Sequence, residues 1–118
     1  MRNRACLTVI TGNTAGQTFR VTRGSSVIGR APNAEIRLVD DGVSRNHARL
    51  RHDSQNQLYV DDLESRNGTY VNGQRITAGT PLKEGDKIQV GRTTVLRFAY
   101  HDELDESFHE SLLSSALR

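Results

Sequence analysis

A chain of 118 residues has room for one ordinary domain and little more. Leu, Ile, Val and Phe make up about 24% of it, above the roughly 20% below which chains tend to remain disordered. The longest apolar runs are three or four residues, which excludes a membrane-spanning helix, and Met1–Cys6 lacks the apolar core of a secretion signal. Because a single cysteine, Cys6, cannot form a disulfide within the chain, we expect a cytoplasmic protein.

The charge is unevenly distributed along the chain. Residues 1–100 hold 15 bases and 9 acids, a net charge of +6, whereas residues 101–118 hold five acids and one base. Fourteen of the sixteen bases are Arg, whose planar guanidinium matches phosphate and carboxylate oxygens, and only Lys83 and Lys87 are Lys. This balance favours an anionic partner; an ordinary solvated surface is the alternative that charge alone leaves open.

Up to about residue 100 the sequence predicts short strands separated by turn residues. This spacing, without a helical period between the runs, predicts an all-β fold, either an antiparallel sandwich or a barrel. In the last run Leu96 and Phe98 share one face and Arg97 the other, as a half-buried strand requires. The apolar or β-branched runs are residues 5–11, 17–21, 25–28, 35–39, 47–52, 57–61, 69–71, 86–90 and 93–100.

The pattern changes at His101 and predicts a C-terminal α-helix. Asp102 can cap a helix whose first turn is acidic, and Leu, Phe and Ala then recur every three to five residues. We therefore expect one domain over residues 1–100 and an α-helical connector over residues 101–118 that leads to a further domain. A dimer through this helix is a related expectation, and a helix packed back on its own sandwich is the alternative.

Polar residues that strand propensity does not explain lie at the ends of the predicted strands. Loops at one end of a sandwich cluster in space, so residues far apart in the sequence can share a site. Three guanidinium groups with a hydroxyl and an amide suit a phosphate monoester presented on a peptide. These groups belong to Arg30, Arg45, Arg66, Ser44 and Asn67.

The order of these loops resembles the forkhead-associated (FHA) domain, a phosphothreonine-peptide reader. The resemblance covers about residues 5 to 100 and implies a β-sandwich of about eleven strands that holds its ligand in loops at one end. It also implies that Arg30 and Ser44 bind phosphate with Arg45 as a further contact, that Asn67 holds the peptide main chain, and that Arg66 lines the groove beside it. The matching blocks are Gly29-Arg30, Ser44-x-x-His47, Asp62-Leu63-x-Ser65-x-Asn67-Gly68-Thr69, and Asn72.

Other residues of these blocks are expected to shape the site without touching the ligand. We expect His47 to bond neighbouring loop backbone from a partly buried position, and Gly29 to allow a close approach at the end of its strand. Gly68 is expected to supply a positive φ in a tight turn. Thr69 and Asn72 are expected to fix that turn through side-chain to backbone bonds. Asp40–Gly42 and Arg75 are candidates for contacts to ligand residues after the phosphothreonine.

A second resemblance concerns the C-terminal part of the chain. Val90-Gly91-Arg92-Thr93, Phe98 and Phe108-His109-Glu110 resemble the junction at which such a domain precedes a diguanylate cyclase (GGDEF) in bacterial proteins. The resemblance implies that ligand binding regulates an attached or partner enzyme in cyclic di-GMP signalling. These 118 residues contain no cyclase motif, so we expect no nucleotide chemistry in this chain.

Catalysis and metal binding are not favoured by the sequence. Ser44, His47 and Asp62 could form a triad, but no nucleophile-elbow pattern surrounds Ser44. No glycine-rich loop with Lys and Ser or Thr is present, and the histidines have no ligand-like spacing with Cys6. We therefore expect no enzyme activity, cofactor or metal.

Two other binding functions stay open at the level of sequence. A net charge of +6 in the body would support weak contact with a nucleic-acid backbone, but the aromatic residues fall mostly in strand runs and are expected in the core, so we expect no nucleic acid. A phosphate-independent interaction or self-association module is the main alternative to the phosphothreonine reader. The expected partner remains a phosphothreonine-containing protein or peptide, without a membrane.

Overall fold

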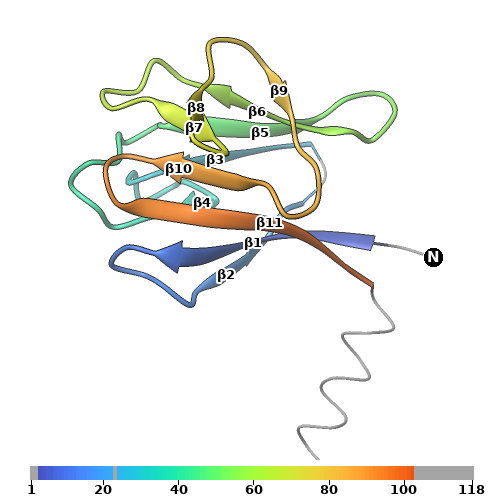
Figure 1. Cartoon of the computed structure of the whole chain (residues 1–118), viewed down its shortest axis with the longest axis horizontal. Helices are drawn as coiled ribbons and strands as arrows, with labels where there is room; N and C mark the ends of the chain where they lie inside the picture. Colours follow the sequence, from blue (N-terminus) through green and yellow to red (C-terminus); the bar gives the residue numbers. More distant parts are fainter. Residues whose placement is uncertain (1–2, 23, 103–118) are drawn as a thin grey trace, which may run out of the picture.

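The computed structural model describes residues 3–22 and 24–102, which form a β-sandwich (Figure 1). Each of the nine runs predicted from the sequence coincides with a strand, and two further short strands, at residues 74–75 and 80–81, were not predicted. No helix that could cross a membrane occurs within these two ranges. The strands are β1 (Asn3–Thr11), β2 (Thr18–Arg20), β3 (Ser25–Gly29), β4 (Ile36–Arg37), β5 (Ala48–His52), β6 (Leu58–Asp62), β7 (Thr69–Val71), β8 (Gln74–Arg75), β9 (Thr80–Pro81), β10 (Lys87–Val90) and β11 (Thr94–Asp102).

The strands form two sheets that pack face to face. One sheet has the order β2-β1-β11-β10-β7-β8 and the other the order β4-β3-β5-β6-β9. The structure is therefore the predicted sandwich and not a barrel. Its pairs are antiparallel except for β3 and β4, which run parallel over Ile28↔Ile36 and Gly29↔Arg37. The open edges are β2 and β8 in one sheet and β4 and β9 in the other.

The core consists of the inward side chains of both sheets. Leu96 and Phe98 are fully buried and Arg97 is exposed, which confirms the predicted faces of the last strand. The ring of Phe98 meets that of Tyr100 edge to face, with centroids 4.9 Å apart. The Phe98 amide donates to the Asp86 carbonyl at 2.8 Å, so the turn before β10 is fixed to the centre of the core.

The last strand continues two residues beyond the boundary expected at residue 100. β1 and β11 pair antiparallel along almost their whole length, from Asn3↔Asp102 to Thr11↔Val95. Pairing with β1 holds His101 and Asp102 in β11, so the expected helix does not begin at His101. The rest of that segment, residues 103–118, lies outside the described residues, and the expected helix and dimer there stay predictions.

The burial of Phe98 leads to a stability prediction. Phe98→Ala removes a buried ring and leaves a cavity, so the free energy of unfolding should fall by about 3–5 kcal/mol. Arg97→Ala, one residue away on the outward face, should change it by less than about 0.5 kcal/mol. Urea unfolding followed by circular dichroism measures both variants. A similar loss in the two variants would contradict this description of β11.

Candidate functional site

Backbone and side-chain hydrogen bonds join three connections between strands at one end of the sandwich. The Arg30 amide, in the β3–β4 connection, donates to the Ser44 carbonyl at 3.0 Å. The Arg66 amide, in the β6–β7 connection, donates to the Ser44 hydroxyl oxygen at 3.0 Å. The Asn67 amide Nδ2 donates to the Gly42 carbonyl at 2.7 Å. The structure thus brings together the five residues that the sequence predicts for the site, at the end where these loops meet (Figure 1).

The β4–β5 loop lies directly against the end of β3. A Cβ built on Gly29 would overlap the Arg45 carbonyl, and the Ala31 amide donates to that same carbonyl at 3.1 Å. Only glycine permits this approach, as predicted for Gly29. The contact places Arg45, whose side chain is exposed, at the same end of the sandwich as Arg30.

Ser44 is held through three of its four polar groups. Its amide donates to His47 Nδ1 at 3.0 Å, its carbonyl accepts from the Arg30 amide, and its hydroxyl oxygen accepts from the Arg66 amide. No acceptor for the hydroxyl proton exists among the described residues. The half-buried hydroxyl is therefore fixed in position with its proton available to an incoming oxygen.

The side chains of Arg30, Arg45 and Arg66 at this loop end are exposed, and none has an acidic partner among the described residues. Arg30 Nε donates to the Val43 carbonyl at 3.1 Å, which orients the side chain and leaves its two terminal nitrogens for a ligand. Within the described ranges, the side chains of Arg45 and Arg66 form neither a hydrogen bond nor an ion pair.

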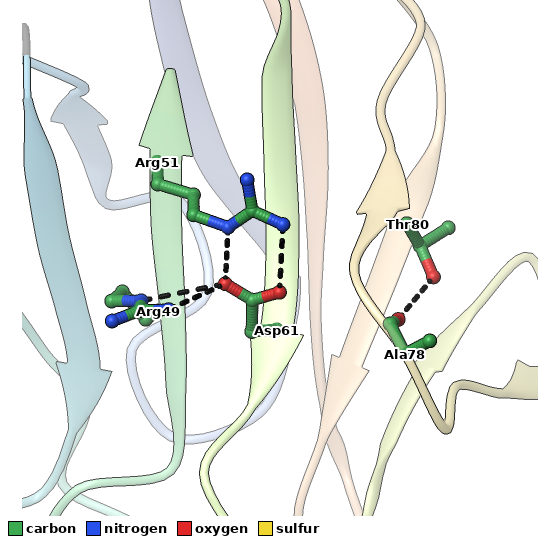
Figure 2. A network of polar contacts seen from close by, with 5 residues as sticks. All are labelled: Arg49, Arg51, Asp61, Ala78 and Thr80. Atoms are coloured by element: carbon green, nitrogen blue, oxygen red, sulfur yellow. Dashed lines mark hydrogen bonds and ion pairs between the residues drawn. The ribbon is translucent and has the colours of Figure 1, made fainter. Parts of the chain in front are cut away.

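Two arginines on β5, Arg49 and Arg51, are neutralised by an acidic partner. Arg51 contacts Asp61 through Nε at 2.7 Å, and Arg49 reaches the same carboxylate at 3.1 Å (Figure 2). The Arg51 hydrogen bond holds the pKa of Asp61 below its ordinary value, with a smaller effect of Arg49, although burial acts in the opposite direction. The three arginines at the loop end have no such partner among the described residues, so they can supply charge-assisted bonds to an anion.

Asn67 keeps part of its hydrogen-bonding capacity. One Nδ2 proton goes to the Gly42 carbonyl. The second Nδ2 proton and the Oδ1 atom have no partner in residues 3–22 and 24–102. One donor beside one acceptor matches the carbonyl and amide of an extended peptide main chain.

His47 connects two of the site loops from a fully buried position. Its Nδ1 accepts from the Ser44 amide, and its Nε2 donates to the Gly68 carbonyl at 2.8 Å. Because an amide only donates and a carbonyl only accepts, these partners assign the neutral tautomer with the proton on Nε2. Burial lowers the pKa of His47, and the Gly68 bond and the charge of Asp62 offset this only in part. The predicted backbone-bonding role is confirmed, and the burial is more complete than expected.

The same contacts exclude a catalytic triad. Both His47 nitrogens are bonded to backbone groups, and the Ser44 hydroxyl oxygen is bonded to the Arg66 amide. No base therefore reaches that hydroxyl. Within the described ranges there is also no cluster of three or more His, Cys, Asp or Glu that could hold a metal.

Asp62 organises the turn that presents Asn67. Its Oδ1 accepts from the Ser65 hydroxyl at 2.6 Å and from the Thr69 hydroxyl at 2.7 Å. Burial raises the pKa of Asp62, but the bonds from Ser65 and Thr69 outweigh it and the pKa lies below its ordinary value. Gly68 has φ = +86°, as predicted. Thr69 fixes the turn, as predicted, but its hydroxyl donates to the Asp62 carboxylate. The predicted bond from Thr69 to the backbone was wrong.

Asn72 acts at a different place from the one predicted. Asn72 and Gly73, with φ of +51° and +85°, form the tight turn between β7 and β8. Asn72 Oδ1 accepts from the Lys87 amide and its Nδ2 donates to Asp86, both at 3.0 Å. Asn72 thus ties this hairpin to the start of β10 and does not contact the turn at Gly68.

Asp40 fixes the loop that contains Gly42, a role that was not predicted from the sequence. Its carboxylate accepts from the hydroxyls of Thr94 at 2.5 Å and Thr93 at 3.1 Å, and from the Gly42 amide at 2.9 Å. The Thr94 bond is the main reason that the pKa of Asp40 is lowered. These bonds fix the loop whose Gly42 carbonyl holds Asn67. The Asp-x-Gly pattern, typical of an Asx turn, was the available signal.

Comparison with known proteins identifies the family. A model of the FHA domain matches residues 26–91, more than half of the chain. The chain therefore belongs to the FHA domain family.

Its relatives include mycobacterial proteins. FHA domain-containing protein FhaA of Mycobacterium tuberculosis is 40% identical over 82 residues, which cover 70% of this chain and 15% of FhaA. Glycogen accumulation regulator GarA of the same organism is 39% identical over 88 residues, which cover 75% of this chain and 53% of GarA. The chain thus corresponds to only part of these relatives.

Solved structures share the fold. One, from a structural and functional analysis of phosphothreonine-dependent FHA domain interactions, matches with a TM-score of 0.73 and 34% identity, over 84% of this chain and 98% of that chain. The FhaA FHA domain, solved in complex with the intracellular domain of another protein, matches with a TM-score of 0.68 and 36% identity, over 79% of this chain and 99% of that chain.

The buried His47 predicts a pH dependence of stability. Its pKa is lower in the folded protein than the value of about 6.5 expected in the unfolded chain, so the unfolded chain takes up a proton first on acidification. The free energy of unfolding should be constant above about pH 7 and fall as the pH drops below 6.5. The lowered pKa values of Asp40, Asp61 and Asp62 act only below about pH 5.

Two measurements check this prediction. Urea unfolding at pH 7.5 and 5.5 should show the loss, and NMR of the His47 ring should give a titration midpoint below 6.5. A midpoint at or above 6.5 would contradict the buried neutral tautomer.

Proposed function

We propose that this FHA domain is a signalling module that binds phosphothreonine peptides. The observation that supports it most strongly is a fixed serine hydroxyl with a free proton, at the same loop end as three exposed arginines that have no acidic partner among the described residues. A dianionic phosphate ester would satisfy these groups at once. A neutral ligand would leave the charges uncompensated.

Each residue has a distinct role in this proposal. Arg30 and Ser44 bind phosphate oxygens, with Arg45 as a further phosphate contact. Asn67 holds the peptide main chain through its remaining donor and acceptor, and Arg66 lines the groove beside it. The relative solved in work on phosphothreonine-dependent interactions agrees with this ligand class.

We further propose that ligand binding regulates a signalling enzyme, either attached or separate. A diguanylate cyclase is suggested by the junction-like residues, but Val90 and Phe98 are buried in the core and Gly91 occupies a turn with φ = +68°. These residues serve the sandwich itself. Of the residues that resemble the cyclase junction, only Phe108–Glu110 have no role in the sandwich, and they lie outside the described residues.

Removal of Arg30 tests the phosphate site directly. A charge-assisted hydrogen bond contributes about 1.5–3 kcal/mol, so Arg30→Ala should weaken phosphothreonine-peptide binding by roughly 10- to 150-fold. Arg97→Ala, an exposed arginine on β11, is the matched control and should keep the wild-type affinity. Fluorescence anisotropy with a phosphothreonine peptide and its unphosphorylated twin measures both.

The unphosphorylated twin separates the alternatives. Equal binding of the two peptides would overturn the proposed function in favour of a phosphate-independent module. A steep dependence of binding on salt without phosphate discrimination would favour a nucleic-acid binder.

The same assay tests the hydroxyl and the preferred phosphoresidue. Ser44→Ala should weaken binding less than Arg30→Ala, because it removes one donor and leaves the arginines. A phosphothreonine peptide should bind about fourfold tighter than its phosphoserine counterpart if the extra methyl is buried, at about 0.8 kcal/mol per carbon. Equal affinities would contradict a methyl pocket.

A further inference from the structure

A groove of about 400 Å³ lies on the side of the sandwich where β8 and β9 form the open edges of the two sheets. It is lined by residues 71–72, 74–81, 83 and 86. None of the five residues assigned to the phosphopeptide site belongs to it. Two of its lining residues, Val71 and Ile76, are almost fully buried.

Arg75 joins this groove to the phosphopeptide loops. Its side chain lines the groove and also lies across Gly68, where an added Cβ would come within 2.9 Å of Arg75 Nε. Gly68 directly follows Asn67, the residue proposed to hold the peptide main chain. A peptide that leaves Asn67 on this side therefore meets the Arg75 guanidinium and then the groove.

On the β8 side of the groove, the backbone N–H and C=O of Arg75 have no hydrogen-bond partner among the described residues. Val71 pairs with Gln74 beside the two-residue turn, and the Ile76 amide donates to the Thr69 carbonyl at 2.9 Å. Arg75 lies between these two hydrogen-bonded pairs and faces Tyr70 in a non-hydrogen-bonded pair. In such a pair the backbone N–H and C=O point away from the partner strand. Both groups face the open edge, where an extended peptide can add as a strand.

The polar rim of the groove is cationic. Arg75 and Lys83 are exposed, and neither side chain forms an ion pair in the described part of the chain. Asp86 lies at the base, but its two oxygens already accept from Asn72 Nδ2 at 3.0 Å and from the Lys83 amide at 2.8 Å. The two cations are thus left for an outside anion.

The far wall of the groove is braced by the ion pair on β5 and β6 (Figure 2). Gly79 packs so closely on Arg51 and Asp61 that a Cβ there would overlap both side chains. The Thr80 hydroxyl donates to the Ala78 carbonyl at 3.0 Å and closes the turn beside them. These contacts fix the turn that forms this side of the groove.

We propose that this groove binds an acidic, extended segment of the same phosphorylated partner, a few residues away from its phosphothreonine. The inference rests on the proposed function. β7 is three residues long, so the hairpin reaches roughly 10 Å beyond Gly68, enough for three or four extended residues. Acidic side chains would meet Arg75 and Lys83, while the main chain pairs with the β8 edge.

The experiment compares phosphothreonine peptides extended by four Glu or by four Gln, on either side of the phosphoresidue. With the wild-type chain, the Glu extension on one side should tighten binding by about 2- to 10-fold over the Gln extension at low salt. Lys83→Gln should remove about 2- to 5-fold of this gain. Lys87→Gln is the matched control, because Lys87 is exposed but does not line the groove.

A second measurement locates the segment. In amide NMR spectra, the signals of Arg75 and of residues 77–79 should shift with the Glu-extended phosphopeptide and not with the unextended one. No shift there, or an equal gain from Glu in the Lys83 and Lys87 variants, would overturn the groove assignment while the Arg30-dependent phosphopeptide binding stands. A third outcome concerns the acidic residues 103–118 of the chain itself. If they occupied the groove, Lys83→Gln would release them and the Gln-extended peptide would bind more tightly to this variant than to the wild type. That result would also overturn the groove assignment.

The outcomes for the two proposals are distinguishable. Loss of binding by Arg30→Ala with every peptide, together with a charge effect confined to Lys83, supports both. If no phosphopeptide binds, or if the unphosphorylated Glu-extended peptide binds equally well, the proposed function is overturned and the groove inference with it.

Discussion

The site depends on one buried imidazole that joins loops of different sheets. His47 accepts from Ser44 before β5 and donates to Gly68 before β7, so it fixes the distance between the two loops. A neutral ring with one donor and one acceptor suits this task, because a charged ring would lose its acceptor and bear the cost of burial. The position of the Ser44 hydroxyl and the presentation of Asn67 both follow from this bridge.

Arginines of this fold differ in whether an acidic side chain neutralises them. On the outer face of β5 and β6, Arg49 and Arg51 share one carboxylate, and they hold a wall of the groove through it. At the loop end Arg30 is oriented by a backbone carbonyl, and Arg30, Arg45 and Arg66 have no acidic partner among the described residues. The first pair of arginines is used within the fold, whereas these three leave their charge for the ligand proposed above.

The sequence allowed the strands with alternating or apolar runs to be predicted, because burial of one face imposes a pattern. β8 and β9 have two residues each and bury little, so no such pattern existed for them. The order of the loops and the family resemblance predicted that Arg30, Ser44, Arg45, Arg66 and Asn67 lie at one end of the sandwich, as they do; their binding roles stay predictions. Three contacts could not be predicted from the sequence, because they depend on how the loops meet in space. They are the bonds of Asp40 to Thr93 and Thr94, the bond of Thr69 to Asp62, and the position of Arg75 across Gly68.

The long β1–β11 pair has a consequence for how the domain would be joined to neighbours. Asn3 and Asp102 lie opposite each other, and the ligand loops lie at the other end, about 27 Å along the paired strands (Figure 1). Any polypeptide attached to either strand would leave from the pole remote from the captured phosphate. A large partner could then reach the loops without a clash with that polypeptide, and any influence on an attached domain would have to span the length of the sandwich.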